Sequence, residues 1–198
     1  MIKAIDTEYK GYRFRSRLEA RWAVYFDSLN IKWEYEVEGF KFKDGTKYLP
    51  DFWLPKMNMW AEVKAKELNE EEERKVKNLV KNTHKNCLLL IGTPERKAYW
   101  AICVDIDICG EPTKDDNGET GYVCHGEFIK YPGEDLEYTF YPNNFALSNY
   151  HNYPQNEDRF YSAFDECEIN EYWFDDIDKH VNKSRSARFE FGESGGSK

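Results

Sequence analysis

The sequence lacks a compact cysteine framework and has no long apolar run. It contains five cysteines in 198 residues, an odd number without a compact framework, which favours a reducing compartment. No apolar stretch approaches the ~20 residues of a membrane-spanning helix, and the first residues lack the apolar core of a secretory signal. We therefore expect a cytoplasmic protein with no membrane partner.

A zinc site is the other role that the cysteines could take. Cys103, Cys109, Cys124 and His125 are the candidate ligands. They lack the Cys-x-x-Cys pair that is typical of structural zinc sites, so buried thiols are the favoured interpretation.

The chain is also short of positive charge in its second half. Residues 1–99 hold 20 Lys and Arg against 16 Asp and Glu, whereas residues 100–198 hold 8 against 21. The net charge of −9 argues against a uniform nucleic-acid-binding surface, because DNA affinity depends on neutralised phosphates. The uneven distribution instead predicts a basic working half, with an acidic half that lies away from a polyanionic substrate or binds a protein partner.

The stretch from Tyr48 to Lys64 predicts a β-hairpin. Tyr48–Leu54 and Met59–Lys64 are short apolar runs around the turn-forming sequence Pro55-Lys56-Met57-Asn58. If those four residues are the loop, the two strands pair in one register. That register sets Leu54 opposite Met59, Trp53 opposite Trp60, Phe52 opposite Ala61 and Asp51 opposite Glu62.

Two acids and a lysine would converge on one face of this hairpin. Directly opposed, Asp51 and Glu62 would have Cβ atoms about 5 Å apart, where like charges destabilise a sheet. Lys64 lies two residues after Glu62, so a strand places both on one face. A divalent cation relieves the repulsion, since Mg²⁺ is commonly held by one or two carboxylates plus phosphate oxygens. The alternative is that these are ordinary solvated strand residues.

A third acid, Glu19, lies near the start of a helix predicted from about Ser16 to Leu29. Apolar residues at helical spacing predict its buried face, and they are Leu18, Trp22, Phe26 and Leu29. Ser16 and Glu19 form a Ser-x-x-Glu capping box, in which Glu19 would accept a hydrogen bond from the Ser16 backbone amide. Capping and metal binding are therefore both open for Glu19.

The order and spacing of four segments in the first half of the chain resemble those of a known family. The segments are Phe14-Arg15-Ser16-Arg17-Leu18-Glu19, Trp33-Glu34-Tyr35-Glu36, Tyr48-Leu49-Pro50-Asp51-Phe52-Trp53-Leu54-Pro55 and Glu62-Val63-Lys64. Together they resemble the PD-(D/E)XK nuclease superfamily, and most of all the phage endonuclease I-type Holliday-junction resolvases. The resemblance covers roughly the first half of the chain, with Ala65 where relatives often carry Gly. It implies an α/β (α+β) fold with a restriction-endonuclease-like αβββαβ core, in which helices flank a mixed sheet.

The resemblance also implies an activity, that of a metal-dependent DNA endonuclease hydrolysing phosphodiester bonds. Glu19, Asp51 and Glu62 would bind Mg²⁺, or Mn²⁺ in its place, with the Val63 carbonyl as a backbone ligand. Lys64 would orient the attacking water and offset negative charge. It would not remove a proton, because adjacent acids oppose the lowered pKa that a base requires.

The predicted substrate is DNA, cleaved in a structure-selective or junction-resolving way by a phage-related enzyme. The alternative is a nuclease-fold protein that binds or inhibits a protein partner through its acidic second half. Whether the chain forms a homodimer stays open.

Arginines near Glu19 and near the end of the chain are the predicted DNA-contacting residues, because cations beside an acid cluster suit a polyanionic substrate. They are Arg13, Arg15, Arg17, Arg21 and Arg185. The alternative for them is a solvated basic face.

Three regions follow from these patterns: a nuclease-like core over residues 1–100, an acidic, aromatic-rich extension packed on it over 101–178, and a basic helix with a flexible tail over 179–198. Further strands are predicted at Ile31–Phe42 with a break at Gly39, and at Cys87–Gly92, Tyr99–Ile106, 121–130 and 136–141. With the turn signal Asp44-Gly45 between the first strand and the Asp51 strand, residues 31–64 would form a three-stranded meander. Further helices are predicted from Asn69, over Asn156–Cys167 and over Asp178–Glu190.

Overall fold

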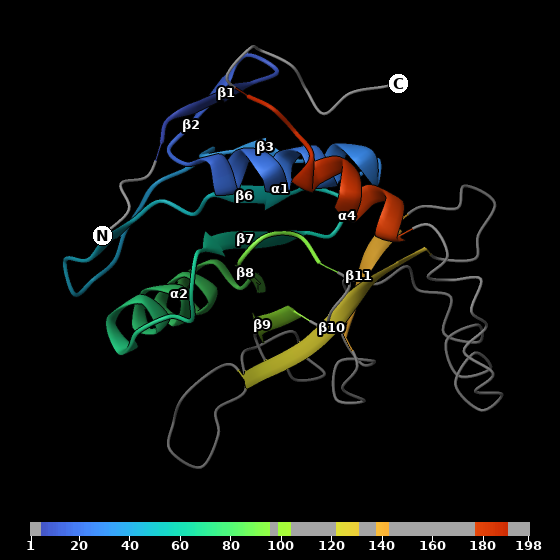
Figure 1. Ribbon diagram of the computed structural model, residues 1–198. Coiled ribbons are helices and arrows are strands. Elements are labelled where there is room, and N and C mark those ends of the chain that lie inside the picture. Colours follow the sequence, from blue (N-terminus) through green and yellow to red (C-terminus); the bar gives the residue numbers. More distant parts are fainter. Residues whose placement is uncertain (1–4, 96–98, 104–121, 131–137, 143–176, 190–198) are drawn as a thin grey trace, which may run out of the picture.

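The computed structural model describes residues 5–95, 99–103, 122–130, 138–142 and 177–189 (Figure 1). These residues form a mixed structure of strands and helices. In chain order the elements are β1 (Thr7–Tyr9), β2 (Tyr12–Phe14), α1 (Arg17–Ser28), β3 (Glu34–Tyr35), β4 (Phe40–Lys41), β5 (Lys47–Tyr48), β6 (Phe52–Leu54), β7 (Met59–Lys64), α2 (Glu70–Thr83), β8 (Cys87–Ile91), β9 (Tyr99–Cys103), β10 (Tyr122–Lys130), β11 (Tyr138–Pro142) and α4 (Ile177–Arg185).

A seven-stranded mixed sheet in the order β11-β10-β9-β8-β7-β6-β3 is the centre of the fold. Its central pair, β7 and β8, is parallel, and the pairs on either side are antiparallel. α1 and α4 lie on one face of the sheet and α2 on the other (Figure 1). The strands β1 with β2, and β4 with β5, form two separate two-stranded sheets.

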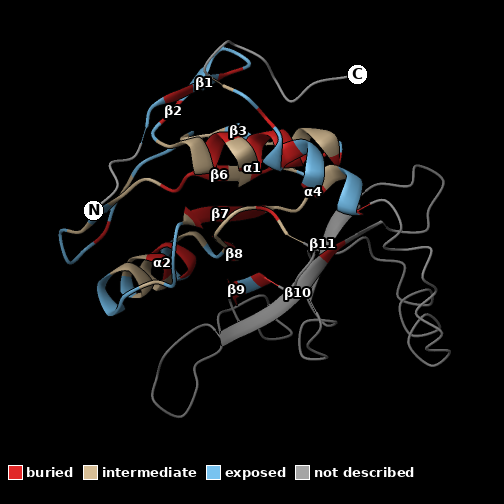
Figure 2. Ribbon diagram, viewed as in Figure 1, coloured by how far each residue is buried: buried red, intermediate tan, exposed pale blue. Residues whose placement is uncertain are grey.

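Alternation along β7 divides its side chains between two hydrophobic cores. Ala61 and Val63 pack in the core beneath α1, whereas Trp60 packs in the core beneath α2. This is the period of a strand, in which successive side chains point to opposite faces. Figure 2 shows the buried residues along α1 and β7. β7 is therefore packed on both of its faces.

Both main helices begin where the sequence predicts. The Ser16 hydroxyl caps α1 by accepting a hydrogen bond from the Glu19 backbone N–H. Asn69 and Glu72 form a reciprocal capping box at the start of α2. The glutamates in the first turn of α2 match the positive end of the helix dipole.

Two predicted strands are broken in the structure. The strand predicted over Ile31–Phe42, with a break at Gly39, is interrupted three residues earlier at Glu36, whose φ of 47° is left-handed and ends β3. The run expected over Tyr48–Leu54 divides into β5 and β6 around Pro50, which has no N–H to donate to a sheet ladder. The three-stranded meander is therefore wrong in detail, because β4 and β5 leave the main sheet and pair with each other.

The described strands beyond residue 100 extend the central sheet. The predicted boundary at residue 100 falls inside β9, and β10 and β11 add on at the same edge. The predicted helix near the end of the chain is confirmed as α4, whose Ile177 and Val181 pack in the α1-side core. The predicted helix Asn156–Cys167 and the tail 190–198 lie outside the described residues. In the described ranges, none of the helices has the length and apolarity that crossing a membrane requires.

Candidate active site

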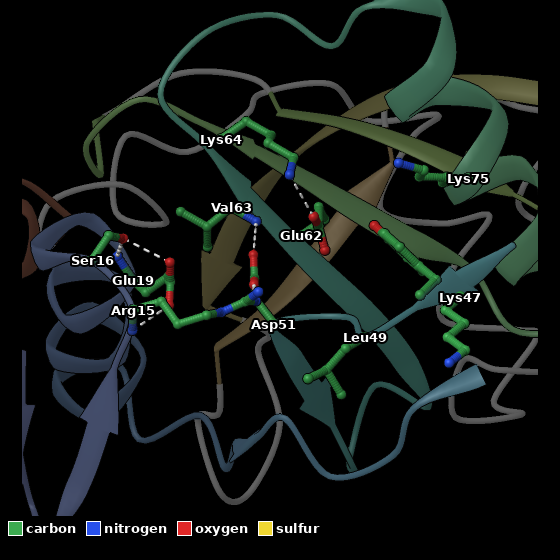
Figure 3. A pocket seen from close by; sticks show the side chains of 11 residues that line it. Arg15, Ser16, Glu19, Lys47, Leu49, Asp51, Glu62, Val63, Lys64 and Lys75 are labelled. Carbon is green, nitrogen blue, oxygen red and sulfur yellow. Dashed lines mark hydrogen bonds and ion pairs between the residues drawn. The ribbon is translucent and has the colours of Figure 1, made fainter. Parts of the chain in front are cut away.

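A pocket of about 370 Å³ opens where α1, β7, α2 and the β5–β6 segment meet. Its lining combines the predicted acids and lysine with further cations (Figure 3). The lining residues are Arg15, Ser16, Glu19, Lys47, Tyr48, Leu49, Asp51, Glu62, Val63, Lys64 and Lys75. The four predicted catalytic residues and Val63 therefore share one cavity.

Asp51 reaches the pocket from just before β6. The predicted hairpin register is confirmed from Leu54–Met59 to Phe52–Ala61, but the ladder stops before Asp51. The side chain replaces the missing backbone pairing, because its Oδ2 accepts a hydrogen bond from the Val63 N–H at 2.7 Å. Its Oδ1 accepts a hydrogen bond from Arg15 Nη2 at 2.6 Å.

Asp51 is buried, with 2% of the residue exposed. Burial raises the pKa of Asp51 well above its ordinary value, and the negative charges of Glu62 and Glu19 raise it further. The Val63 amide and the Arg15 guanidinium act in the opposite direction. The net elevation means that negative charge at this position is under-compensated by the surrounding protein.

Glu62 and Lys64 project from β7 on one face, as predicted. Lys64 Nζ lies 2.8 Å from Glu62 Oε1 and 3.8 Å from Glu72 Oε1. Burial lowers the pKa of Lys64, but the charge of Glu62 and the hydrogen bond to it outweigh burial, so the pKa is raised overall. Lys64 is therefore a cation, which agrees with an orienting role rather than a basic one.

The second carboxylate oxygen of Glu62 is buried and has no hydrogen-bond partner among the described residues. The Tyr48 hydroxyl is likewise buried without a hydrogen bond of good geometry. Burial raises the pKa of Tyr48, followed by the charge of Glu62, and the hydroxyl is near enough to Glu62 for a weak hydrogen bond to contribute as well, so the phenol is neutral. A buried carboxylate oxygen without a partner is costly, and such an atom is a ready ligand for a hard cation.

Glu19 is held by three donors. Its Oε1 accepts from Ser16 Oγ at 2.7 Å, and its Oε2 accepts from Tyr35 Oη at 2.5 Å and from the Arg15 backbone N–H at 3.2 Å. The predicted acceptance from the Ser16 amide is therefore wrong, because the carboxylate reaches one residue further back along the chain. Glu19 still lines the pocket, so its capping contacts leave it on the same cavity as Asp51.

Of the predicted DNA-contacting arginines, Arg15 is the one at the pocket. Its Nε lies 2.6 Å from Glu36 Oε1 while its Nη2 bonds Asp51, as Figure 3 shows for its approach to Asp51. Arg13 is exposed and pairs with Asp6 at 2.6 Å. Arg17 opens α1 outside the pocket lining.

Arg21 serves the docking of α4 and not the pocket. Its Nη1 donates to the carbonyl oxygens of Ser184 at 3.2 Å and Arg185 at 2.5 Å. Its guanidinium also lies over the Phe189 ring at 6.0 Å. Arg185 is exposed at the end of α4 and is not among the lining residues.

The sequence analysis did not predict a site role for the pocket residues Lys47, Tyr48, Leu49 and Lys75. Tyr35, outside the pocket lining, also supports Glu19 from β3. Their positions depend on where β3, β5 and α2 pack, which local sequence patterns do not reveal. Lys75 also forms an ordinary i,i+4 pair with Glu71, so its spacing indicated a solvated helix face.

Within the described ranges, no group of at least three His, Cys, Asp or Glu side chains is arranged to hold a metal ion. Cys87 is a buried free thiol. The side chains of the zinc candidates, for which buried thiols are the favoured interpretation, lie outside the described part. Comparison with protein-family models, curated proteins and solved structures finds no match. The functional assignment therefore depends on the pocket itself.

Proposed function

We propose that the protein is a metal-dependent DNA endonuclease with a restriction-endonuclease-like core, related to the PD-(D/E)XK enzymes. The observation that carries the proposal is the meeting of Glu19, Asp51, Glu62 and Lys64 in one pocket. They come from α1, the start of β6 and the end of β7. All three acids are buried, which an ordinary solvated surface does not require.

The donor set fits a hard divalent cation such as Mg²⁺ or Mn²⁺. Asp51 and Glu62 would hold it, with the Val63 carbonyl as a backbone ligand, and Glu19 would bind a second ion directly or through water. Mg²⁺ needs only one or two protein carboxylates when substrate phosphates and water complete its shell. The unpartnered Oε2 of Glu62 and the raised pKa of Asp51 both support this fit, since a bound cation relieves each of them.

A bound divalent cation activates water and stabilises charge on the phosphorus and the leaving oxygen. The chain's own residues position the reactants. Lys64, held by Glu62 at 2.8 Å, would orient the attacking water and offset charge that develops on the phosphoryl oxygens. Lys47 and Lys75 add positive charge on the side of the pocket opposite Ser16 and Glu19 (Figure 3).

Arg15 has a second role in this proposal. It bridges Asp51 and Glu36, and its charge lowers the pKa of Asp51 against burial. Arg15 thereby helps to keep Asp51 ionised and able to bind a cation. Its side chain is 55% exposed, so the guanidinium is also accessible to a phosphate.

The test is incubation of the full chain with linear, flapped and four-way DNA, with Mg²⁺ and with EDTA. Cleavage of any of the three in Mg²⁺ and its loss in EDTA would support the proposal. A preference for flapped or four-way DNA would specify a structure-selective or junction-resolving enzyme. No cleavage of any substrate in Mg²⁺ or Mn²⁺ would contradict it. The alternative, a protein-binding role of the acidic segment, concerns residues that mostly lie outside the described part of the chain.

A further inference from the structure

The β4–β5 hairpin presents two lysines side by side. Lys41 is directly opposite Lys47 in the register of the two strands, so their Cβ atoms are about 5 Å apart, where like charges destabilise the pairing. Both side chains are exposed. Neither forms an ion pair with any residue in the described ranges. The hairpin therefore carries a repulsion that the described protein does not relieve.

The other face of the hairpin is anchored firmly to the core. Phe40 and Phe42 point inward, and Phe40 contacts Trp60 of β7 edge to face, with ring centroids 5.4 Å apart. At the tip, Asp44 Oδ2 accepts hydrogen bonds from Arg74 Nη1 at 3.0 Å and from Asn78 Nδ2 at 3.2 Å, both on α2. The tip turn is closed by Gly45 at a φ of +83°, which suits glycine.

This anchoring sets the two lysines at the edge of the candidate active site. Lys47 itself lines the pocket, and Figure 3 shows it on the far side of Glu62 from Glu19. Directly opposed residues in an antiparallel pair point to the same face, so Lys41 continues the positive surface away from the pocket. The only acid between Phe40 and Tyr48 is Asp44, and it is occupied by α2.

We propose that the β4–β5 hairpin is a DNA-backbone contact beside the cleavage site, in which Lys41 and Lys47 bind neighbouring phosphates of one strand. This rests on the proposed nuclease function. A DNA strand carries one negative charge every 3.4 Å or so along the helix axis, so two ammonium groups on adjacent stems meet neighbouring phosphates. Such contacts position the substrate without reading its sequence. The phosphates supply the charge compensation that the hairpin lacks.

The salt dependence of DNA binding tests the proposal. Affinity of the full chain for duplex DNA would be measured over a series of salt concentrations, with Ca²⁺ in place of Mg²⁺ so that binding is separated from cleavage. The variants are Lys41→Gln, Lys41→Gln/Lys47→Gln, and a matched control, Lys32→Gln/Lys81→Gln, which removes two exposed lysines elsewhere.

Each lost phosphate contact reduces the slope of log K against log salt by about 0.9 on duplex DNA. We expect a reduction of about 0.9 for the single hairpin variant and about 1.8 for the double, with the control slope unchanged. The melting temperature of the double variant without DNA should be equal to or above that of the wild type, because the repulsion is removed. A hairpin that is merely structural would lower it.

Equal slopes for the wild type and the double hairpin variant would overturn the hairpin contact, as would an equal reduction in the control. Cleavage by the wild type in Mg²⁺ is measured separately. If the wild type cleaves DNA but the double hairpin variant has the wild-type salt slope, only the proposed hairpin contact is rejected. If the double variant has a reduced slope but the wild type cleaves no DNA, only the proposed nuclease function is rejected. Absence of DNA binding by the wild type overturns the hairpin contact outright.

Discussion

The side chain of Asp51 hydrogen-bonds the backbone of Val63, with 2.7 Å between Asp51 Oδ2 and Val63 N. This contact continues the β6–β7 pairing where the backbone ladder has ended at Phe52. It places one carboxylate against the strand that also carries Glu62. The Asp51 carboxylate is therefore held by the sheet itself, where burial of its charge raises its pKa.

That burial predicts an unusual dependence of stability on pH. Because the pKa of Asp51 is raised in the folded state, the folded protein binds more protons than the unfolded chain above the unfolded pKa of about 3.9. The contribution of Asp51 to the free energy of unfolding therefore falls as pH rises through this window. Glu62→Gln removes the largest charge that raises this pKa, so its stability should decline less steeply with pH. Denaturant unfolding at several pH values measures this, and an unchanged slope in Glu62→Gln would contradict it. Glu73→Gln, an exposed acid on α2, is the control.

A divalent cation should stabilise the folded protein through the same residues. At 100 times the dissociation constant, binding adds about 2.7 kcal/mol, which for a chain of this size raises the melting temperature by about 5–10 °C. We expect this increase in Mg²⁺ or Ca²⁺, its reversal by EDTA, and its loss in Asp51→Asn. A shift of the same size in Asp51→Asn would show that the cation binds elsewhere.

Variants of Glu19 and Tyr35 distinguish the capping contacts of Glu19 from a role in activity. Glu19→Gln keeps an oxygen that can accept from Tyr35 Oη or the Arg15 amide, so stability should change by less than about 1 kcal/mol while cleavage falls at least about 10-fold. Tyr35→Phe removes the donor but leaves the carboxylate, and should lower stability by about 1 kcal/mol with a smaller loss of cleavage. If Glu19→Gln retains full activity and only Glu19→Ala melts earlier, Glu19 is a helix cap alone.

Arg21 should behave as a structural residue. Arg21→Gln removes the donor to the Ser184 and Arg185 carbonyls and should lower the free energy of unfolding by about 1 kcal/mol. The salt slope of DNA binding should stay as in the wild type. A slope reduced by about 0.9 would restore Arg21 to the DNA-contacting set.

Local patterns in the sequence predicted the parts of the fold that local physics controls. The loop at Pro55–Asn58 and the alternation around it predicted the pairing of Trp53 with Trp60, and the cap at Asn69 predicted the start of α2. Because β-strand geometry puts alternate residues on one face, Glu62 and Lys64 could be placed together without a structure.

Contacts between distant segments could not be predicted in this way. Arg15 meets Asp51 across 36 positions of the sequence, and Arg21 meets Ser184 across 163. Both depend on how helices pack on the sheet. Gly39 indicated a break in the strand Ile31–Phe42, but the left-handed residue is Glu36, three positions earlier, where the sequence has no glycine.

The central claim is tested most directly by single-turnover cleavage of the DNA that the wild type cuts fastest, in Mg²⁺. The variants are Asp51→Asn, Glu62→Gln, Lys64→Ala, the Asp51→Asn/Glu62→Gln double variant and the control Glu73→Gln. Each single site variant should be slower by at least about 100-fold with an unchanged circular dichroism spectrum. The double should be little worse than its singles, since residues acting as a unit are not additive, and the control should match the wild type. Cleavage by Asp51→Asn at the wild-type rate would contradict the assignment of this pocket as the active site.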